Sequence, residues 1–554
     1  MTDRLDIALA QINPTVGALR HNLELIRQAR AQAAARGAHL VLTTELSLSG
    51  YPPEDLVLKP FFLDRVEEAV RELAADTVDG GPGIIVGAPW RGEAGAVHNA
   101  ALLLDGGQMQ AVRLKHDLPN YGPFDEKRVF APGPLPGPVN FRGVRLGLMV
   151  CEDMWSADVA ETLLETGAEI LLVPNGSPFE TDKAERRLNL ALERVVETGL
   201  PLIYVNQVGG QDELVFDGGS FALNPGGALV AQLPRFRSHV GLTRWTRDGE
   251  GWTGSSTELT PPADGLAAIY QAMVLGLRDY VGKNGFPGVL LGMSGGIDSA
   301  ISAAVAVDAL GADKVHCVMM PSPYTSQDSL DDAAECAGML GCRIDTISIA
   351  PAMEAYASML APHFQGRDPD ITEENLQSRA RGMTLMALSN KFGAMVLTTG
   401  NKSEMAVGYA TLYGDMCGGY SVLKDVYKMT VYALSNWRNQ HLPEGALGPA
   451  GRVIPERIIT KAPTAELRPG QTDQDSLPPY PVLDDILECL VEREMGLAEI
   501  VARGHEEATV RRVWRLLDRA EYKRRQAPPG VKITSRSFGR DRRYPITSGA
   551  LNLI

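Results

Sequence analysis

Short apolar runs alternate with amphipathic stretches along the first 240 residues of the chain. Runs bounded by turn residues are typical of buried strands, whereas apolar residues spaced three and four apart predict helices. The predicted strands are 6–12, 40–45, 83–89, 144–151, 170–174 and 201–205. Helical patterns lie between several of them, at 22–36 and 184–198. This order predicts an α/β sandwich for the first half.

The second half alternates strands and helices more regularly. After an opening helix at about 266–283, the predicted order is strand 289–293, helix 299–311, strand 315–320, helix 328–340, strand 344–349, helix 373–391 and strand 394–398. Alternating elements of this length predict a doubly wound, Rossmann-like parallel sheet, with ligands at the carboxyl ends of its strands. The polar, turn-rich passage between the halves predicts a linker.

Length and composition agree with two domains. A chain of 554 residues exceeds what one hydrophobic core usually supports, and we expect domains at 1–245 and 265–554 joined by a linker at 246–264. A net charge of −15 argues against nonspecific binding to nucleic acid or anionic membranes. The six cysteines form no Cys-x-x-Cys pair, and no apolar segment reaches the ~18 residues of a membrane span. With no secretory signal at the start, a cytoplasmic location is expected.

The hexapeptide Ser294-Gly295-Gly296-Ile297-Asp298-Ser299 joins an apolar run to an Ala-rich helical stretch. Its two glycines, two hydroxyls and the following helix N-terminus suit a pyrophosphate group. Asp298 stands where a Walker A loop carries Lys, which implies a bridging Mg2+. The alternative is a tight strand-to-helix turn. The expected ATP-binding residues here are Gly292, Met293, Ser294, Gly295, Gly296, Ile297, Asp298 and Ser299.

The segment 398–404 follows the fourth predicted strand of the same sheet. Glu404 is placed there to share Mg2+ with Asp298, and Thr399 to face the nucleotide. The alternative interpretation makes 401–403 a surface turn, with Glu404 capping the next helix. The hexapeptide favours the metal-binding hypothesis, and its sequence resembles the pyrophosphate loop of the ATP pyrophosphatases.

Three residues of the first half stand at strand ends or beside turn signals: Glu45, Lys115 and Cys151. A thiol attacks an amide carbonyl if a base takes its proton and a cation or N–H donors stabilise the oxyanion. Glu45 is the candidate base and Lys115 the candidate cation. Taken singly, the alternatives are a buried small thiol, a paired carboxylate and a solvated surface charge.

In this order, with Tyr51-Pro52-Pro53 after the Glu, the three residues resemble the Glu-Lys-Cys triad of the nitrilase superfamily. The resemblance implies an α-β-β-α sandwich, with Glu126 as a supporting carboxylate. The variant Cys151-Glu152-Asp153-Met154-Trp155, with 175–179 downstream, is similar to the glutaminase domain of glutamine-dependent NAD synthetases. That resemblance implies that glutamine is held by Tyr121, Ser177 and Lys183.

The second half is similar to the synthetase domain of the same family at 375–381, 413–415, 425–428 and 461–467. The resemblance implies ATP contacts from Thr399, Lys428 and Thr464. It implies deamido-NAD contacts from Asn375, Glu404, Asp415 and Lys523. One departure is Leu412, where ammonia-dependent bacterial members carry Lys. The basic run 522–525, with the basic residues after it, otherwise indicates a nucleic-acid tail, and a solvated surface is the alternative for the later arginines, 536, 540, 542 and 543.

The family resemblance implies an ATP-dependent ligase that converts deamido-NAD to NAD with ammonia from glutamine. An acyl-adenylate is the expected intermediate, and AMP, pyrophosphate and glutamate the other products. The expected cofactor is Mg2+, with ATP as cosubstrate. No nucleic-acid or membrane partner is expected. The family resemblance implies a homo-oligomer, specifically a homo-octamer. Two alternatives stay open: another glutamine-dependent amidotransferase of this type, or a nucleotide-sensing regulator fused to an amidase.

Overall fold

The computed structural model describes residues 3–92, 95–249 and 251–550, and divides into two compact units, Met1–Ala263 and Asp264–Ile554. The first unit contains two large sheets. The seven-stranded sheet has the order β15 (Gly251–Ser255), β14 (His239–Asp248), β1 (Arg4–Gln11), β2 (Leu40–Leu42), β3 (Gly83–Arg91), β4 (Val97–Asp105) and β5 (Gln108–Leu114). The six-stranded sheet has the order β13 (Leu229–Gln232), β12 (Phe221–Leu223), β9 (Leu202–Asn206), β8 (Ile170–Asn175), β7 (Val144–Leu148) and β6 (Val139–Phe141). A hairpin of β10 (Val208–Gln211) and β11 (Leu214–Asp217) accompanies them.

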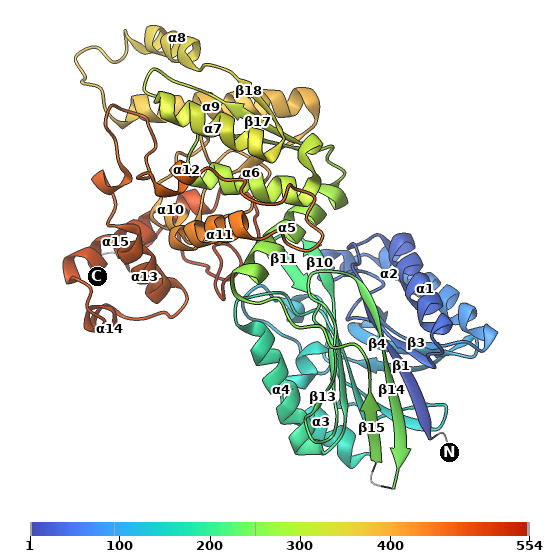
Figure 1. The fold of residues 1–554 in the computed structure, drawn as a ribbon. Helices are drawn as coiled ribbons and strands as arrows, with labels where there is room; N and C mark the ends of the chain where they lie inside the picture. The colour runs from blue at the N-terminus through green and yellow to red at the C-terminus, as the bar shows by residue number, and fades with distance from the viewer. Residues whose placement is uncertain (1–2, 93–94, 250, 551–554) are drawn as a thin grey trace. The chain divides into compact units, whose positions relative to one another are not determined.

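Helices cover the outer faces of both sheets, which makes the first unit an α-β-β-α sandwich (Figure 1). They are α1 (Leu19–Ala35) and α2 (Pro60–Asp76) on one side, and α3 (Ala157–Glu165) and α4 (Lys183–Thr198) on the other. Alternation along β1 shows why: Ile7 and Leu9 pack into the core between the sheets, whereas Ala8 and Ala10 face the helices. The expected fold of this half is confirmed.

The second unit is built on a five-stranded sheet whose strands are all parallel. Its order is β18 (Arg343–Thr346), β17 (Val315–Met319), β16 (Val289–Gly292), β19 (Met395–Thr398) and β20 (Tyr420–Ser421). The helices nearest it are α5 (Gly265–Asn284), α6 (Ile297–Leu310), α7 (Gln327–Leu340), α8 (Ala350–Leu360) and α9 (Ile371–Phe392). Because Val318 packs against α9 while its neighbour Cys317 lies beside Cys336 of α7, helices lie on both faces, as expected of a doubly wound sheet.

A helical cluster completes the second unit. Its members are α10 (Lys402–Val407), α11 (Lys428–Gln440), α12 (Glu456–Thr460), α13 (Tyr480–Val491), α14 (Leu497–Ala502), α15 (Glu507–Arg519) and α16 (Glu521–Arg524). Residues of α10, α13, α14 and α15 share one hydrophobic core. Among the described residues, no helix combines the length and apolar character that crossing a bilayer requires.

The structure differs from the sequence expectation in the passage 246–264. The end of β14 and all of β15 lie in this span and pair antiparallel in the seven-stranded sheet. The buried Trp252 explains the difference, because its side chain joins the core between the two sheets. The turn residues of this passage therefore bound a hairpin strand, and the first part of the expected linker belongs to the sandwich.

Candidate functional site

Cys151 lies at a sharp turn directly after β7. Its φ of 49° is in the left-handed region, and it begins a single 3-10 turn, Cys151–Met154. The Asp153 carboxylate fixes this turn, since it accepts hydrogen bonds from the backbone N–H groups of Val150 at 2.8 Å, His116 at 2.9 Å and Asp117 at 2.8 Å. Asp153 therefore ties the turn of Cys151 to the segment that follows Lys115, a role that sequence reasoning missed.

Glu45, Lys115 and Glu126 meet in a buried cluster. Lys115 Nζ donates to Glu45 Oε1 at 2.7 Å and to both Glu126 oxygens at 2.9 Å. Glu45 and Lys115 are 0% exposed. An ion pair this deep is tolerated because further donors satisfy the carboxylates. Tyr51 Oη donates to Glu126 at 2.8 Å.

Two further donors hold the Glu45 carboxylate. Asn99 Nδ2 donates to Oε1 at 2.8 Å, and the backbone N–H of Gly176 donates to Oε2 at 2.9 Å. A Cβ on Gly176 would lie 2.8 Å from the Tyr51 ring, so only glycine brings the backbone this close. Neither Asn99 nor Gly176 carries a sequence signal for this role.

Burial and charge set the proton equilibria of the cluster. Burial raises the pKa of the Cys151 thiol well above its usual value, and Glu45 raises it further against the opposing effect of Lys115. Burial also raises the pKa of Glu126 to about 7. At neutral pH Cys151 is therefore a protonated thiol, which would need a base to act as a nucleophile.

The structure brings the three residues expected to hold glutamine to this region. Ser177 follows Gly176 and is buried. Tyr121 is 50% exposed and its hydroxyl donates to Glu152 at 3.0 Å. Tyr121 and Lys183 both contact the ring of Phe124, at 5.5 Å in each case. Tyr121 and Lys183 are thus joined through Phe124, and Tyr121 is tied to Glu152, the residue after Cys151.

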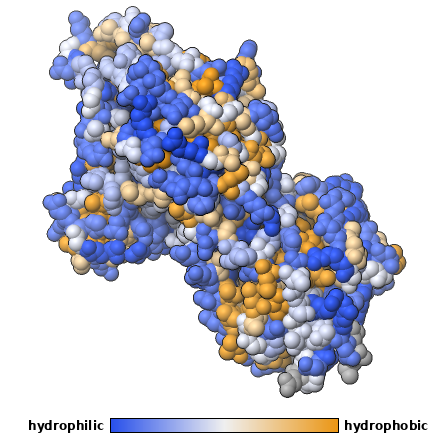
Figure 2. Space-filling model, viewed as in Figure 1, coloured by the Kyte–Doolittle hydropathy of each residue, from blue (hydrophilic) through white to orange (hydrophobic). Residues whose placement is uncertain are grey.

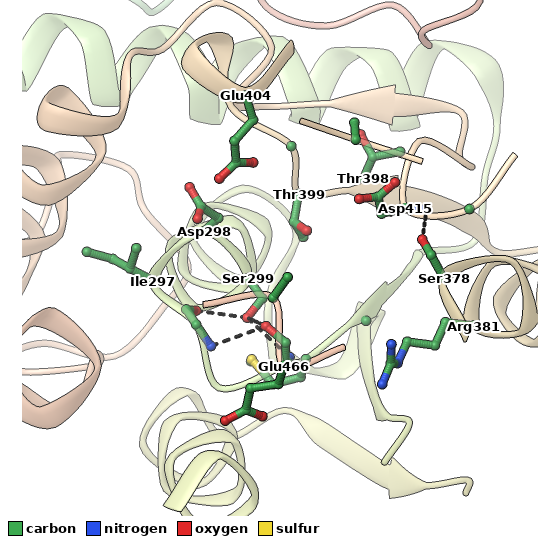
Figure 3. A pocket seen from close by; sticks show the side chains of 18 of the residues that line it. Ile297, Asp298, Ser299, Ser378, Arg381, Thr398, Thr399, Glu404, Asp415 and Glu466 are labelled. Atoms are coloured by element: carbon green, nitrogen blue, oxygen red, sulfur yellow. Dashed lines mark hydrogen bonds between the residues drawn. The ribbon is translucent and has the colours of Figure 1, made fainter. Parts of the chain in front are cut away.

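The second site is a cavity of about 310 Å3 at the carboxyl end of the parallel sheet. The loop after β16 and the start of α6 line it, with Ile297, Asp298 and Ser299 among the lining residues (Figure 3). Gly295 has a φ of 78°, and a Cβ there would lie 2.3 Å from the Ser329 carbonyl oxygen. The Ser294 and Ser299 hydroxyls are 3.2 Å apart, and Gly296 N–H donates to Ser294 Oγ at 3.2 Å. These groups gather hydroxyls and N–H donors at the start of α6, as a phosphate requires.

Asp298 and Glu404 point toward one another across this cavity (Figure 3). Lys428 Nζ pairs with Asp298 Oδ2 and with Glu404 Oε1, the latter at 3.1 Å. Asn401 Nδ2 donates to Asp298 at 2.9 Å, while its Oδ1 caps α10 by accepting from the Glu404 N–H at 3.0 Å. The alternative role for Glu404 as helix cap is thus filled by Asn401. Burial raises the pKa of Glu404 to about 7, and Asp298 adds to the effect.

The two carboxylates suit Mg2+ only together with other oxygen ligands. Across the described part of the chain, no group of three or more His, Cys, Asp or Glu side chains is arranged to hold a metal ion. Mg2+ is commonly bound by one or two carboxylates plus substrate phosphates and water. The pair Asp298 and Glu404, beside a phosphate-sized loop, fits that ligand set.

The other expected residues fall into two groups. Thr399, Asp415, Lys428 and Thr464 line the cavity. Of the residues that the structure describes, Asn375 and Lys523 contact protein groups beside it: Asn375 accepts from Thr411 Oγ1 at 2.9 Å, and Lys523 donates to the Gly408 and Ala410 carbonyls at 2.8 and 2.6 Å. Charged lining residues that the sequence analysis did not select are Arg381, Lys424, Lys461, Glu466 and Asp473.

The two sites define a class of protein: a nitrilase-type amide hydrolase joined to a nucleotide-binding domain with a pyrophosphate loop. Family models agree, since the carbon-nitrogen hydrolase model matches residues 6–248 and the NAD synthase model matches residues 269–527. The chain is 52% identical over 551 residues to the glutamine-dependent NAD(+) synthetase of Rhodobacter capsulatus, covering 99% of both chains. It is 45% identical to that of Acinetobacter baylyi, covering 98% of both chains.

A solved structure shows the same similarity. The glutamine-dependent NAD+ synthetase from Acinetobacter baumannii, in complex with ADP, is 43% identical and superimposes with a TM-score of 0.78, covering 99% of each chain. The chain therefore belongs to the family of glutamine-dependent NAD(+) synthetases.

Proposed function

We propose that the chain converts deamido-NAD to NAD with ATP and with ammonia released from glutamine. The observation that best supports this proposal is the presence of two sites in one chain. One is the buried Glu45–Lys115–Glu126 cluster beside Cys151, and the other is a nucleotide-sized cavity over the loop 294–299. The full-length similarity to glutamine-dependent NAD(+) synthetases supports this choice of substrates. A regulator would need neither the base beside its thiol nor paired carboxylates beside the loop.

In the first domain, Glu45 takes the proton of the Cys151 thiol as its sulfur attacks the side-chain amide of glutamine. Lys115 is the cation that stabilises the tetrahedral oxyanion. The amide nitrogen leaves as ammonia after receiving a proton from Glu45. The remaining glutamyl thioester is hydrolysed by water, which returns the thiol and releases glutamate. Tyr121, Ser177 and Lys183 orient the glutamine.

In the second domain, the nicotinate carboxylate attacks the α-phosphorus of ATP, and pyrophosphate leaves over the loop 294–299. The resulting acyl-adenylate accepts ammonia and releases AMP. Thr399, Lys428 and Thr464 hold ATP, while Asn375, Asp415 and Lys523 position deamido-NAD. Asp298 and Glu404 would hold Mg2+, which supplies positive charge beside the phosphates.

We also propose that the chain acts as a homo-oligomer in the cytoplasm. Its surface shows hydrophobic patches among the polar residues (Figure 2). In the second unit α8 has no buried residue, and large apolar side chains of α8 and α9 are 60–67% exposed: Met359, Ile371, Met383 and Phe392. Such exposure favours association with a second copy. Light scattering of the wild type and of Met383→Glu tests the oligomer.

The cytoplasmic location is supported by the cysteines. All six are free, which suits a reducing compartment.

The experiment that tests the function is pyrophosphate release from ATP and deamido-NAD, with glutamine or ammonium as nitrogen donor. We expect the wild type to make NAD with both donors, and Cys151→Ala to make NAD only with ammonium. Cys489→Ala, which removes a buried thiol of the other domain, is the matched control and should retain both activities. Pyrophosphate release that does not depend on deamido-NAD would contradict the proposal and favour another acceptor.

A further inference from the structure

The segment Gly176–Pro178 carries Ser177, one of the residues proposed to hold glutamine, and is held from two sides. On the catalytic side, Gly176 N–H donates to Glu45 Oε2 at 2.9 Å. Asn206 fixes Ser177 with two backbone hydrogen bonds, accepting from its N–H at 2.9 Å and donating to its carbonyl at 3.1 Å. The position of this segment therefore affects both the orientation of the Glu45 carboxylate and the position of the Ser177 hydroxyl.

Arg187 of α4 holds the outer side of the same segment. Its Nε donates to Ser177 Oγ at 3.1 Å, and its Nη2 donates to the carbonyls of Ser177 at 2.9 Å and Pro178 at 2.7 Å. One planar group thus binds a side chain and two consecutive peptides, which fixes the orientation of the segment. Because Ser177 Oγ accepts from Arg187, its own hydrogen is directed to another acceptor.

Asp217, at the end of β11, supplies the counter-charge. Arg187 Nη1 donates to Asp217 Oδ1 at 2.8 Å, and both side chains are at most 4% exposed. Arg235 donates to the other oxygen at 2.9 Å. Although burial disfavours the charge, the two guanidinium groups keep the pKa of Asp217 below its usual value. A buried guanidinium without this carboxylate would be costly, so Asp217 keeps Arg187 in place.

We propose that Arg187, held by Asp217, is a positioning residue of the glutamine site. It sets the segment 176–178 so that Gly176 stays on Glu45 and Ser177 stays in the site. The inference rests on the proposed glutaminase function and adds to it a residue that touches neither substrate nor thiol. It predicts that weakening the hydrogen bonds of Arg187 impairs glutamate release from glutamine and leaves ammonium-dependent NAD formation unchanged.

Arg187→Lys is the test variant. An ammonium group still pairs with Asp217, but it cannot reproduce the planar fork that reaches Ser177 and Pro178 together. The matched control is Arg30→Lys in α1 of the same domain, whose mostly buried guanidinium likewise joins a carboxylate, Asp79 at 2.6 Å, to a backbone carbonyl, Pro82 at 2.8 Å. Glutamate release is measured against glutamine concentration, and NAD formation is measured with ammonium on the same preparations.

For Arg187→Lys we expect the KM for glutamine to rise about tenfold and kcat for glutamate release to fall about tenfold, since charge-assisted hydrogen bonds are lost. Ammonium-dependent NAD formation should stay within about twofold of wild type, and Arg30→Lys should retain both activities. A merely structural defect would reduce the active fraction, lowering kcat without raising KM.

An unchanged KM for glutamine, or an equal loss with both nitrogen donors, would overturn the proposal. If Arg187→Lys does not fold, Asp217→Asn replaces it: the same shape without the counter-charge should raise the KM for glutamine about threefold or more. The proposed function fails separately, if the wild type releases no glutamate or makes no NAD.

Discussion

Replacing Glu45 by Gln tests the assignment of the general base. Each group that the structure places on the Glu45 carboxylate is a donor: Lys115 Nζ and Asn99 Nδ2 on Oε1, and Gly176 N–H on Oε2. An amide must direct its NH2 at one of these donors, so one buried hydrogen bond becomes a donor-donor contact. The variant therefore loses the proton acceptor and disturbs the cluster.

The expected size follows from general base catalysis, which contributes about 10^2 to 10^4-fold. We expect kcat/KM for glutamate release by Glu45→Gln to fall by about this factor at pH 7. NAD formation with ammonium should stay within about twofold of wild type, because that reaction bypasses the thiol. Glu258→Gln is the control: it removes a partly buried carboxylate of the same domain that pairs with Arg36.

The pH dependence sharpens the test. Burial raises the pKa of Cys151, so the thiol is protonated at pH 7 and its thiolate fraction grows about tenfold per pH unit below that pKa. Without its base, Glu45→Gln depends on the thiolate fraction of Cys151. Its kcat/KM for glutamate release should therefore approach that of the wild type by about tenfold per pH unit between pH 7 and 9. Glutamate release is followed by a coupled assay. A loss of kcat/KM below about tenfold at pH 7, or a loss that does not change with pH, would refute Glu45 as the general base.

Three further predictions concern the charges and the loop. Lys115→Met leaves two buried carboxylates without a counter-charge and should destabilise the first domain by about 3–5 kcal/mol at pH 8. Burial raises the pKa of Glu126 and Lys115 opposes this, so removing Lys115 raises the pKa further. The loss should therefore grow as pH rises above the ordinary pKa of a Glu and be smaller at pH 5 than at pH 8, which thermal unfolding at both pH values checks. Gly295→Ala, at a φ of 78° and facing the Ser329 carbonyl, should raise the KM for ATP about tenfold, whereas Gly338→Ala meets no atom within 4 Å and should not. Asp298→Asn should lower pyrophosphate release with both nitrogen donors by about 100-fold and leave glutamate release unchanged.

Much of the fold was predictable because local patterns set it. The strand 289–293, the loop and the helix after it lie within two residues of their predicted bounds. The apolar runs of the first half predicted an α/β sandwich, and the nitrilase resemblance implied the α-β-β-α order that the structure has. The hairpin strand Gly251–Ser255 was not predicted, because its turn residues resemble those of a linker and only the packing of Trp252 makes it part of the sheet. The short helices after residue 400 were missed for a related reason, since tertiary packing stabilises helices of four to six residues.

The sequence by itself determined which chemistry this protein carries. Glu45, Lys115 and Cys151 in order, and the hexapeptide 294–299, identify the family because their chemistry depends on residue type and on local loop geometry. Only the tertiary structure decided what holds these groups in place. Asn99, Asp153, Gly176 and Arg187 act through contacts that span up to 131 residues of sequence, and such contacts leave no local pattern. The same holds for proton equilibria, since the pKa values of Cys151 and Glu126 depend on burial, which the folded core alone creates.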